Sequence, residues 1–152
     1  MNQRLKEIED RLPPPISPVG NYVFVKRTGD LAFTSGIIPL RDGKLVATGK
    51  LGGGLSVEQG AMCARICAEN ALSLVLEALG CNLEAIREVV SLRAIVSSTP
   101  DFIEHAKVAN GASDFLVEVF GDSGKHTRSA FGAPSLPLDA PVEIEFVFRI
   151  EQ

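Results

Sequence analysis

One arginine in the C-terminal third of the chain lies where a charge needs a partner. Arg128 belongs to an apolar run over 126–132 that has the composition of a β-strand, and an unpaired buried guanidinium is costly. A further strand is predicted over 142–150, with Glu143 near its start. If the two strands pair, Arg128 and Glu143 lie close together. They then form a structural ion pair, or Arg128 binds a carboxylate ligand through two parallel hydrogen bonds.

The cysteines and histidines match no reactive or metal-binding motif. Cys63 and Cys67 are four residues apart on a predicted helix. Two ligands do not make a zinc site, so we expect both to be small core residues. With Cys81 they form an odd set without the spacing of a disulfide framework, which indicates a reducing compartment. His105 lies in a polar stretch of a predicted helix and is expected on the surface.

Several motifs of known chemistry are absent from the sequence. There is no Gly-x-Ser-x-Gly elbow, and Gly49-Lys50 is followed by Leu51 instead of the Ser or Thr of a phosphate-binding loop. The sequence marks no Ser-His-Asp triad, although it leaves such an arrangement open. The net charge of −4 argues against a general nucleic-acid binder, which presents a basic face to the phosphates.

Hydrophobic periodicity predicts the helices that must position these residues. The chain has 152 residues, of which 45% are hydrophobic and 22% charged, as is typical of one compact domain. A short amphipathic helix is predicted over 2–12 and ends at Pro13–Pro15. A long helix is predicted over 57–79, because Ser56 and Gln59 form a capping box at its start.

Short β-forming runs complete the predicted domain. Strands over 22–27 and 31–35 flank Gly29-Asp30 and indicate a hairpin. A strand over 89–98 follows the long helix, and Thr99-Pro100 is predicted to start a second helix that reaches Phe120. With the two last strands, this order predicts an α+β domain whose long helices both pack on one face of a sheet.

The other face of that sheet is also expected to be apolar. Val23, Val25, Phe146 and Phe148 would lie on it. An exposed apolar patch of that size is unusual for a monomer. We therefore predict a homotrimer that buries this second face.

Several short segments together resemble one known family. They are Gly20-Asn21-Tyr22, Thr34-Ser35-Gly36-Ile37-Ile38-Pro39, Arg128-Ser129, Leu136-Pro137 and Val142-Glu143-Ile144-Glu145. With this spacing the chain resembles the Rid family, also called the YjgF or liver perchloric-acid-soluble endoribonuclease family. Asn110-Gly-Ala-Ser-Asp and the loop at 121–126 resemble its endoribonuclease-like branch. The resemblance implies one domain over 1–152 with a chorismate-mutase-like fold, a mixed sheet, and an N-terminal helical extension over 1–15.

The resemblance also implies an assembly and an activity. The assembly is a homotrimer with clefts between subunits. The activity is hydrolysis of reactive enamines and imines, such as 2-aminoacrylate or 2-iminobutyrate, to 2-keto acids and ammonia, with no metal or organic cofactor. The implied catalytic residues are Arg128 for the substrate carboxylate, Glu143 for the attacking water and Tyr22 in the cleft wall, and those beside the substrate are Ser35, Gly36, Asn110 and Ala130.

Two departures from the family pattern leave the substrate open. Ile37 and Ala130 stand where deaminases of the family usually have glutamine and cysteine, so we expect a more apolar cleft without a thiol. One alternative is a non-catalytic protein that binds a small carboxylate. Another is an endoribonuclease, which the acidic charge and the single tyrosine disfavour.

No segment of the sequence is expected to span a membrane. The longest stretch without a charge, 12–25, is too short and contains several prolines. The charged N-terminus does not have the pattern of a signal peptide. We therefore expect a cytoplasmic protein.

Overall fold

The fold is an α+β domain, as the sequence predicts. The computed structural model describes residues 2–151. The helices are α1 (Gln3–Glu9), α2 (Val57–Leu79) and α3 (His105–Phe120), with short 3₁₀ turns η1 (Leu83–Ala85), η2 (Gly121–Gly124) and η3 (Pro137–Asp139). The strands are β1 (Val25–Thr28), β2 (Leu31–Thr34), β3 (Leu40–Arg41), β4 (Lys44–Leu45), β5 (Ile86–Ser97), β6 (Thr127–Ala133) and β7 (Val142–Ile150). No helix among the described residues is long and apolar enough to cross a membrane.

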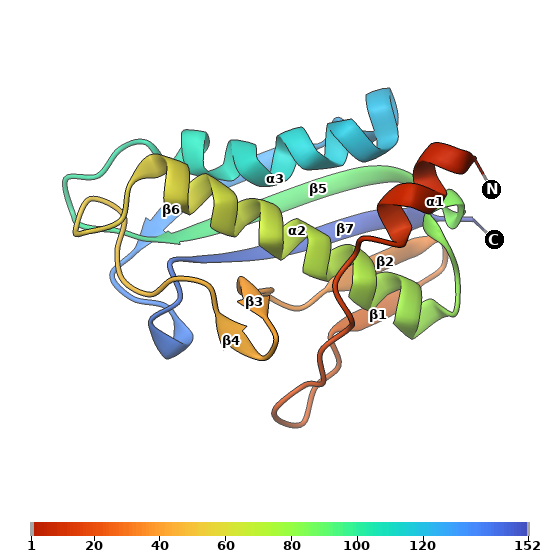
Figure 1. The fold of residues 1–152 in the computed structure, drawn as a ribbon, viewed down its shortest axis with the longest axis horizontal. Coiled ribbons are helices and arrows are strands. Elements are labelled where there is room, and N and C mark those ends of the chain that lie inside the picture. The colour runs from red at the N-terminus through yellow and green to blue at the C-terminus, as the bar shows by residue number, and fades with distance from the viewer. Residues whose placement is uncertain (1, 152) are drawn as a thin grey trace.

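The main sheet has five strands in the order β1-β2-β7-β5-β6. The β5–β6 pair is parallel and the other pairs are antiparallel, so the sheet is mixed. The small β3–β4 hairpin stands apart from it. Figure 1 shows α2 and α3 side by side over one face of the sheet, which confirms the predicted layer arrangement.

Helix α2 has the predicted boundaries because its end signals are local. The Gln59 N–H donates to Ser56 Oγ at 3.1 Å, and the Ser56 N–H donates to Gln59 Oε1 at 2.9 Å. Gly80 ends the helix in a left-handed conformation with φ 59°, which glycine adopts without a Cβ clash. One side of α2 is fully buried and includes Cys63 and Cys67, both 0% exposed.

Helix α3 begins later than predicted. It starts at His105, not at Thr99-Pro100. The Thr99 N–H donates to the Leu51 carbonyl at 3.0 Å, so the backbone at this position continues the pairing at the end of β5. The Thr99 carbonyl then accepts from the Phe102 N–H at 3.2 Å, so the chain makes a turn here before α3 begins.

The N-terminal helix is shorter than predicted but packs as its periodicity indicates. Helix α1 ends at Glu9 instead of residue 12. Leu5, Ile8 and Leu12 pack against the core. The Glu9 carboxylate accepts a hydrogen bond from the Leu83 N–H at 2.9 Å, which ties the extension to η1.

The open face of the sheet differs from the prediction. Phe146 and Phe148 are 1% and 0% exposed, because they lie under the helices. Strand side chains alternate between faces, and β7 needs its more apolar set for the covered face. The alternate residues of β7 on the open face are therefore mostly charged, and Arg93 pairs there with Glu145 at 3.6 Å. Phe33 of β2, which is next to β7, and Phe131 of β6, at the edge of the sheet beyond β5, are exposed hydrophobic residues.

Candidate functional site

Arg128 is held against α3 by neutral polar side chains. Its Nη1 donates to Asn110 Oδ1 at 2.7 Å and to Ser113 Oγ at 3.1 Å. Within residues 2–151 its Nε and Nη2 have no hydrogen-bond partner, and no carboxylate forms an ion pair with it. The N–H groups of Nε and Nη2 lie on one edge of the guanidinium, and such an edge binds both oxygens of a carboxylate.

The expectation that Arg128 and Glu143 form an ion pair is wrong. Strand β5 lies between β6 and β7, so the two strands do not pair. Arg128 is in register with Leu92, and Glu143 with Ile95. Strand spacing and rise place their Cα atoms roughly 14 Å apart. Alternation along the strands also puts them on opposite faces of the sheet, with Arg128 on the side of α3.

Glu143 lies against the loop that follows β2. A Cβ atom added to Gly36 would be 2.6 Å from Cδ of Glu143, so any side chain at this position would displace the carboxylate from where it lies. The side chain is half-buried. Burial raises the pKa of Glu143 above its ordinary value of 4.5, and the nearby Glu145 carboxylate adds to the rise.

Ser35 joins this loop to the segment that carries Tyr22. Its backbone N–H donates to the Phe24 carbonyl at 2.8 Å, and its Oγ donates to the Val23 carbonyl at 2.7 Å. Tyr22 is 49% exposed and packs edge-to-face on Phe24, with ring centroids 5.8 Å apart. It precedes β1, which starts at Val25 and not at residue 22 as predicted.

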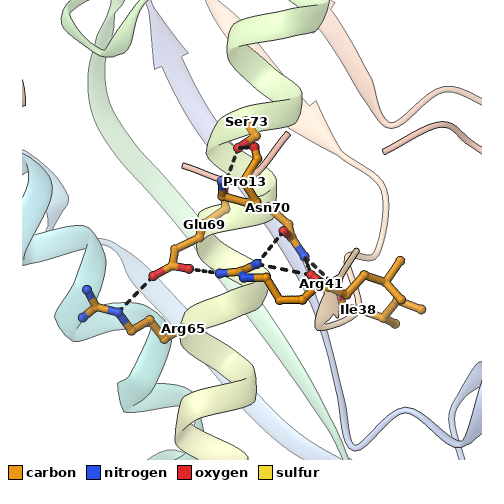
Figure 2. Close-up of polar contacts among 8 residues, drawn as sticks. Pro13, Ile38, Arg41, Arg65, Glu69, Asn70 and Ser73 are labelled. Carbon is orange, nitrogen blue, oxygen red and sulfur yellow. Dashed lines mark hydrogen bonds and ion pairs between the residues drawn. The ribbon is translucent and has the colours of Figure 1, made fainter. Parts of the chain in front are cut away.

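A buried amide of α2 supports the same loop from behind. Asn70 is 3% exposed, and its Nδ2 donates to the carbonyls of Ile38 at 3.3 Å and Leu40 at 3.0 Å. Arg41 donates to Asn70 Oδ1 at 3.0 Å and pairs with Glu69. Figure 2 shows this network between α2 and the chain after Gly36. Sequence reasoning missed Asn70, although an amide within the small, apolar stripe of this helix is a signal.

The two positions that depart from the deaminase pattern have different surroundings. Ile37 is 1% exposed and exchanges two backbone hydrogen bonds of 2.9 Å with Ile144. Its side chain belongs to the core, so the expectation that it makes the cleft more apolar is wrong. Ala130 is half-buried in β6, two residues after Arg128, and packs against the core.

The thiols are core residues, as predicted. Burial raises the pKa of Cys63 to about 11 and also raises that of Cys67 well above its ordinary value. Both thiols are free. No group of three or more His, Cys, Asp or Glu residues within 2–151 is arranged to hold a metal ion.

The expectation that His105 is a solvated surface residue is wrong. His105 is half-buried, with Nε2 3.4 Å from Ser98 Oγ and its ring edge-on to Phe102. It lines a cavity of about 620 Å³ between the ends of β5 and β6, together with Lys50 and Gly132. None of the predicted site residues lines this cavity.

The predicted site residues thus fall into two groups within one chain. We define the arginine group as Arg128, Asn110, Ser113, His126 and Ala130, which lie on α3, on β6 and directly before β6. We define the glutamate group as Glu143, Tyr22, Ser35 and Gly36, on β7 and around β1 and β2. The first group can hold an anion, and the second presents a carboxylate whose pKa is raised by burial. Sequence reasoning missed Ser113 and His126.

Comparison with known proteins identifies the family. Residues 2–149 match the family described as "YjgF/chorismate mutase-like, putative endoribonuclease". Protein TCP17 of Trypanosoma cruzi is 39% identical over 147 residues, which cover 96% of this chain and 91% of that protein.

Solved structures agree with this match. The crystal structure of protein Atu1372 from Agrobacterium tumefaciens is 39% identical and superposes with a TM-score of 0.89, covering 97% of this chain and 91% of that one. E. coli TdcF, solved with bound serine, has the same fold at 24% identity and a TM-score of 0.63, covering 93% of this chain and 94% of that one. These matches confirm the family resemblance, and the chain belongs to the YjgF/chorismate mutase-like family.

Proposed function

We propose that this protein hydrolyses reactive 2-imino acids, and the enamines from which they form, to 2-keto acids and ammonia. The proposal rests on one observation, the oriented guanidinium of Arg128 with its free edge. Its guanidinium is oriented by Asn110 and Ser113 and keeps one edge free, with no carboxylate of the described chain to neutralise it. A 2-imino acid has a carboxylate next to the reacting carbon, so this edge can bind the carboxylate and fix the imine beside it.

Glu143 supplies the second function that the reaction needs. Imine hydrolysis adds a water to the imine carbon and transfers protons to the nitrogen, which leaves as ammonia. A carboxylate with a raised pKa is a suitable acceptor for the proton of the attacking water, because its basicity is closer to neutral pH. Gly36 leaves space for this carboxylate, and Ser35 fixes the adjacent chain.

The two groups lie on opposite faces of one chain, so we propose that the complete site forms between copies. The arginine group of one subunit would face the glutamate group of the next in a homotrimer with three such clefts. The exposed Phe33 and Phe131 on the open face of the sheet support association through that face. A closed ring gives every subunit one of each contact.

The activity is tested with an imine generated in solution. An L-amino-acid oxidase produces 2-iminobutyrate or 2-iminopropionate from the amino acid, and release of 2-keto acid is compared with the spontaneous rate. We expect an acceleration by the wild type and its loss in Glu143→Gln. Release at the spontaneous rate with wild-type protein would reject the proposal.

A non-catalytic carboxylate-binding protein is the second candidate. One observation favours it: the arginine group is complete within one chain, whereas the glutamate group lies elsewhere. A binding protein of this kind would bind a 2-keto acid with the wild-type affinity in Glu143→Gln and would not accelerate imine hydrolysis.

A further inference from the structure

We propose that Ser113 and His126 form a positioning pair that orients Arg128 for its anionic ligand. The inference rests on the proposed carboxylate site and adds two residues to it. Neither residue needs to touch the ligand. Their role is to hold Nη1 so that the edge formed by Nε and Nη2 is presented in one orientation.

The hydrogen bonds of the pair run in one direction. His126 Nδ1 lies 2.6 Å from the carbonyl oxygen of Gly124. A carbonyl only accepts, so Nδ1 carries a proton, and the tautomer with its proton on Nδ1 leaves Nε2 as an acceptor. Ser113 Oγ lies 2.9 Å from Nε2 and therefore donates its hydroxyl proton to it. The serine oxygen is then oriented to accept from Arg128 Nη1 at 3.1 Å.

The backbone at both ends of this chain of hydrogen bonds is fixed by close packing. A Cβ at Gly124 would overlap the Leu116 carbonyl of α3, so the η2 turn presses directly on that helix. A Cβ at Gly111 would overlap the Ala61 carbonyl, so α3 in turn lies directly against α2. The Gly124 carbonyl and the Ser113 side chain are therefore held at a constant separation.

The positioning pair determines which edge of the guanidinium is open to a ligand. Nη1 donates its hydrogen bonds to Asn110 and Ser113, so a ligand binds at the edge formed by Nε and Nη2. Without His126 the Ser113 hydroxyl can rotate and donate elsewhere, so it no longer offers a fixed lone pair to Arg128. The Arg128 side chain then samples more rotamers in the absence of ligand. Ligand binding must restrict these rotamers, and this entropic cost weakens the affinity.

The test measures binding of pyruvate, a 2-keto acid with the carboxylate in the expected place, by titration calorimetry. We expect His126→Phe and Ser113→Ala each to weaken pyruvate binding about tenfold, the usual effect of losing one hydrogen bond to a charged group. Their double variant should lose no more than either one, because both act through the same contact. His126→Gln should retain most of the affinity, since its Oε1 can accept from the Ser113 hydroxyl.

Steady-state kinetics give a second readout. A contact to the carboxylate is present in substrate and transition state alike, so KM should rise while kcat stays near the wild-type value. A merely structural role would lower the melting temperature and would not be rescued by His126→Gln.

The outcomes separate this inference from the proposed function. If Arg128→Lys binds pyruvate as tightly as the wild type, the carboxylate site itself is wrong. If Arg128→Lys loses affinity but His126→Phe and Ser113→Ala bind like the wild type, the positioning pair is wrong and the site stands. Equal weakening in His126→Phe and His126→Gln would also overturn the proposed hydrogen-bond order.

Discussion

The arginine group and the glutamate group are built in opposite ways. Arg128 is exposed, and side chains of α3 hold it by hydrogen bonds to one of its nitrogens. Glu143 is half-buried, and a missing Cβ at Gly36 and a backbone loop shape its surroundings. Exposure keeps a guanidinium available to an anion from solvent, whereas burial raises the pKa of a carboxyl. The first arrangement suits recognition, and the second suits proton transfer.

Arg128→Lys should give the largest effect and act on recognition alone. Lysine keeps the charge but cannot offer two parallel N–H groups. We expect kcat/KM for imine hydrolysis to fall by about one to two orders of magnitude. The melting temperature should remain close to that of the wild type, because Arg128 forms no ion pair within the described chain. If Arg128→Lys kept full activity but melted at a much lower temperature, the role of Arg128 would be structural.

Asn70→Ala should damage the glutamate group through its support. The Ile38 and Leu40 carbonyls would lose a buried donor, and Arg41 would lose an acceptor. We expect the free energy of unfolding, measured in urea, to fall by about 1–3 kcal/mol. Pyruvate affinity, which reports the arginine group, should not change. If Asn70→Ala also weakened pyruvate binding, the arginine group would depend on the support of the glutamate group, and the two groups would not be independent.

Gly36→Ala should displace the Glu143 carboxylate at little cost in stability. The added Cβ meets the flexible end of a side chain rather than the backbone. We expect kcat to fall about tenfold, as for a misplaced proton acceptor, while KM stays the same. Ala78→Ser adds one heavy atom at an exposed position of α2 outside both groups, so it is a matched control and should leave kcat near the wild-type value.

Glu143→Gln should have a small, pH-dependent effect on stability. A carboxyl whose folded-state pKa is raised above 4.5 destabilises the folded state once it ionises. Wild-type stability should therefore fall as the pH rises from 4.5 to the folded-state pKa, and then level off. The glutamine variant should melt slightly higher than the wild type at neutral pH and equally below pH 4.5. A wild type that is the more stable one at neutral pH would contradict the raised pKa.

The elements that were predicted correctly depend on local signals. The capping box at Ser56 and the left-handed Gly80 are sufficient to place both ends of α2. The start of α3 depends instead on a backbone bond from Thr99 to Leu51, far away in sequence. The covered face of β7 was assigned wrongly because alternation separates two faces but does not say which one the helices cover.

The site was predictable residue by residue but not as an arrangement. The resemblance indicated Arg128 and Glu143, yet their distance depends on β5 lying between their strands. Ser113 and His126 are 13 residues apart, and only the η2 turn brings them together. Asn110 and Ser113, three positions apart on one helix, share a face, so their spacing could have signalled a common partner.

The most direct test of the account is to divide the site between subunits. Arg128→Lys and Glu143→Gln proteins are unfolded together, refolded as a mixture, and assayed with 2-iminobutyrate beside each variant alone. If the arginine group of one copy completes the glutamate group of the next, every mixed trimer regains one intact site. Random mixing in equal amounts should then restore about one quarter of the wild-type activity. A mixture no more active than the average of the two variants, with mixed assemblies confirmed by native mass spectrometry, would show that the site is not shared between copies.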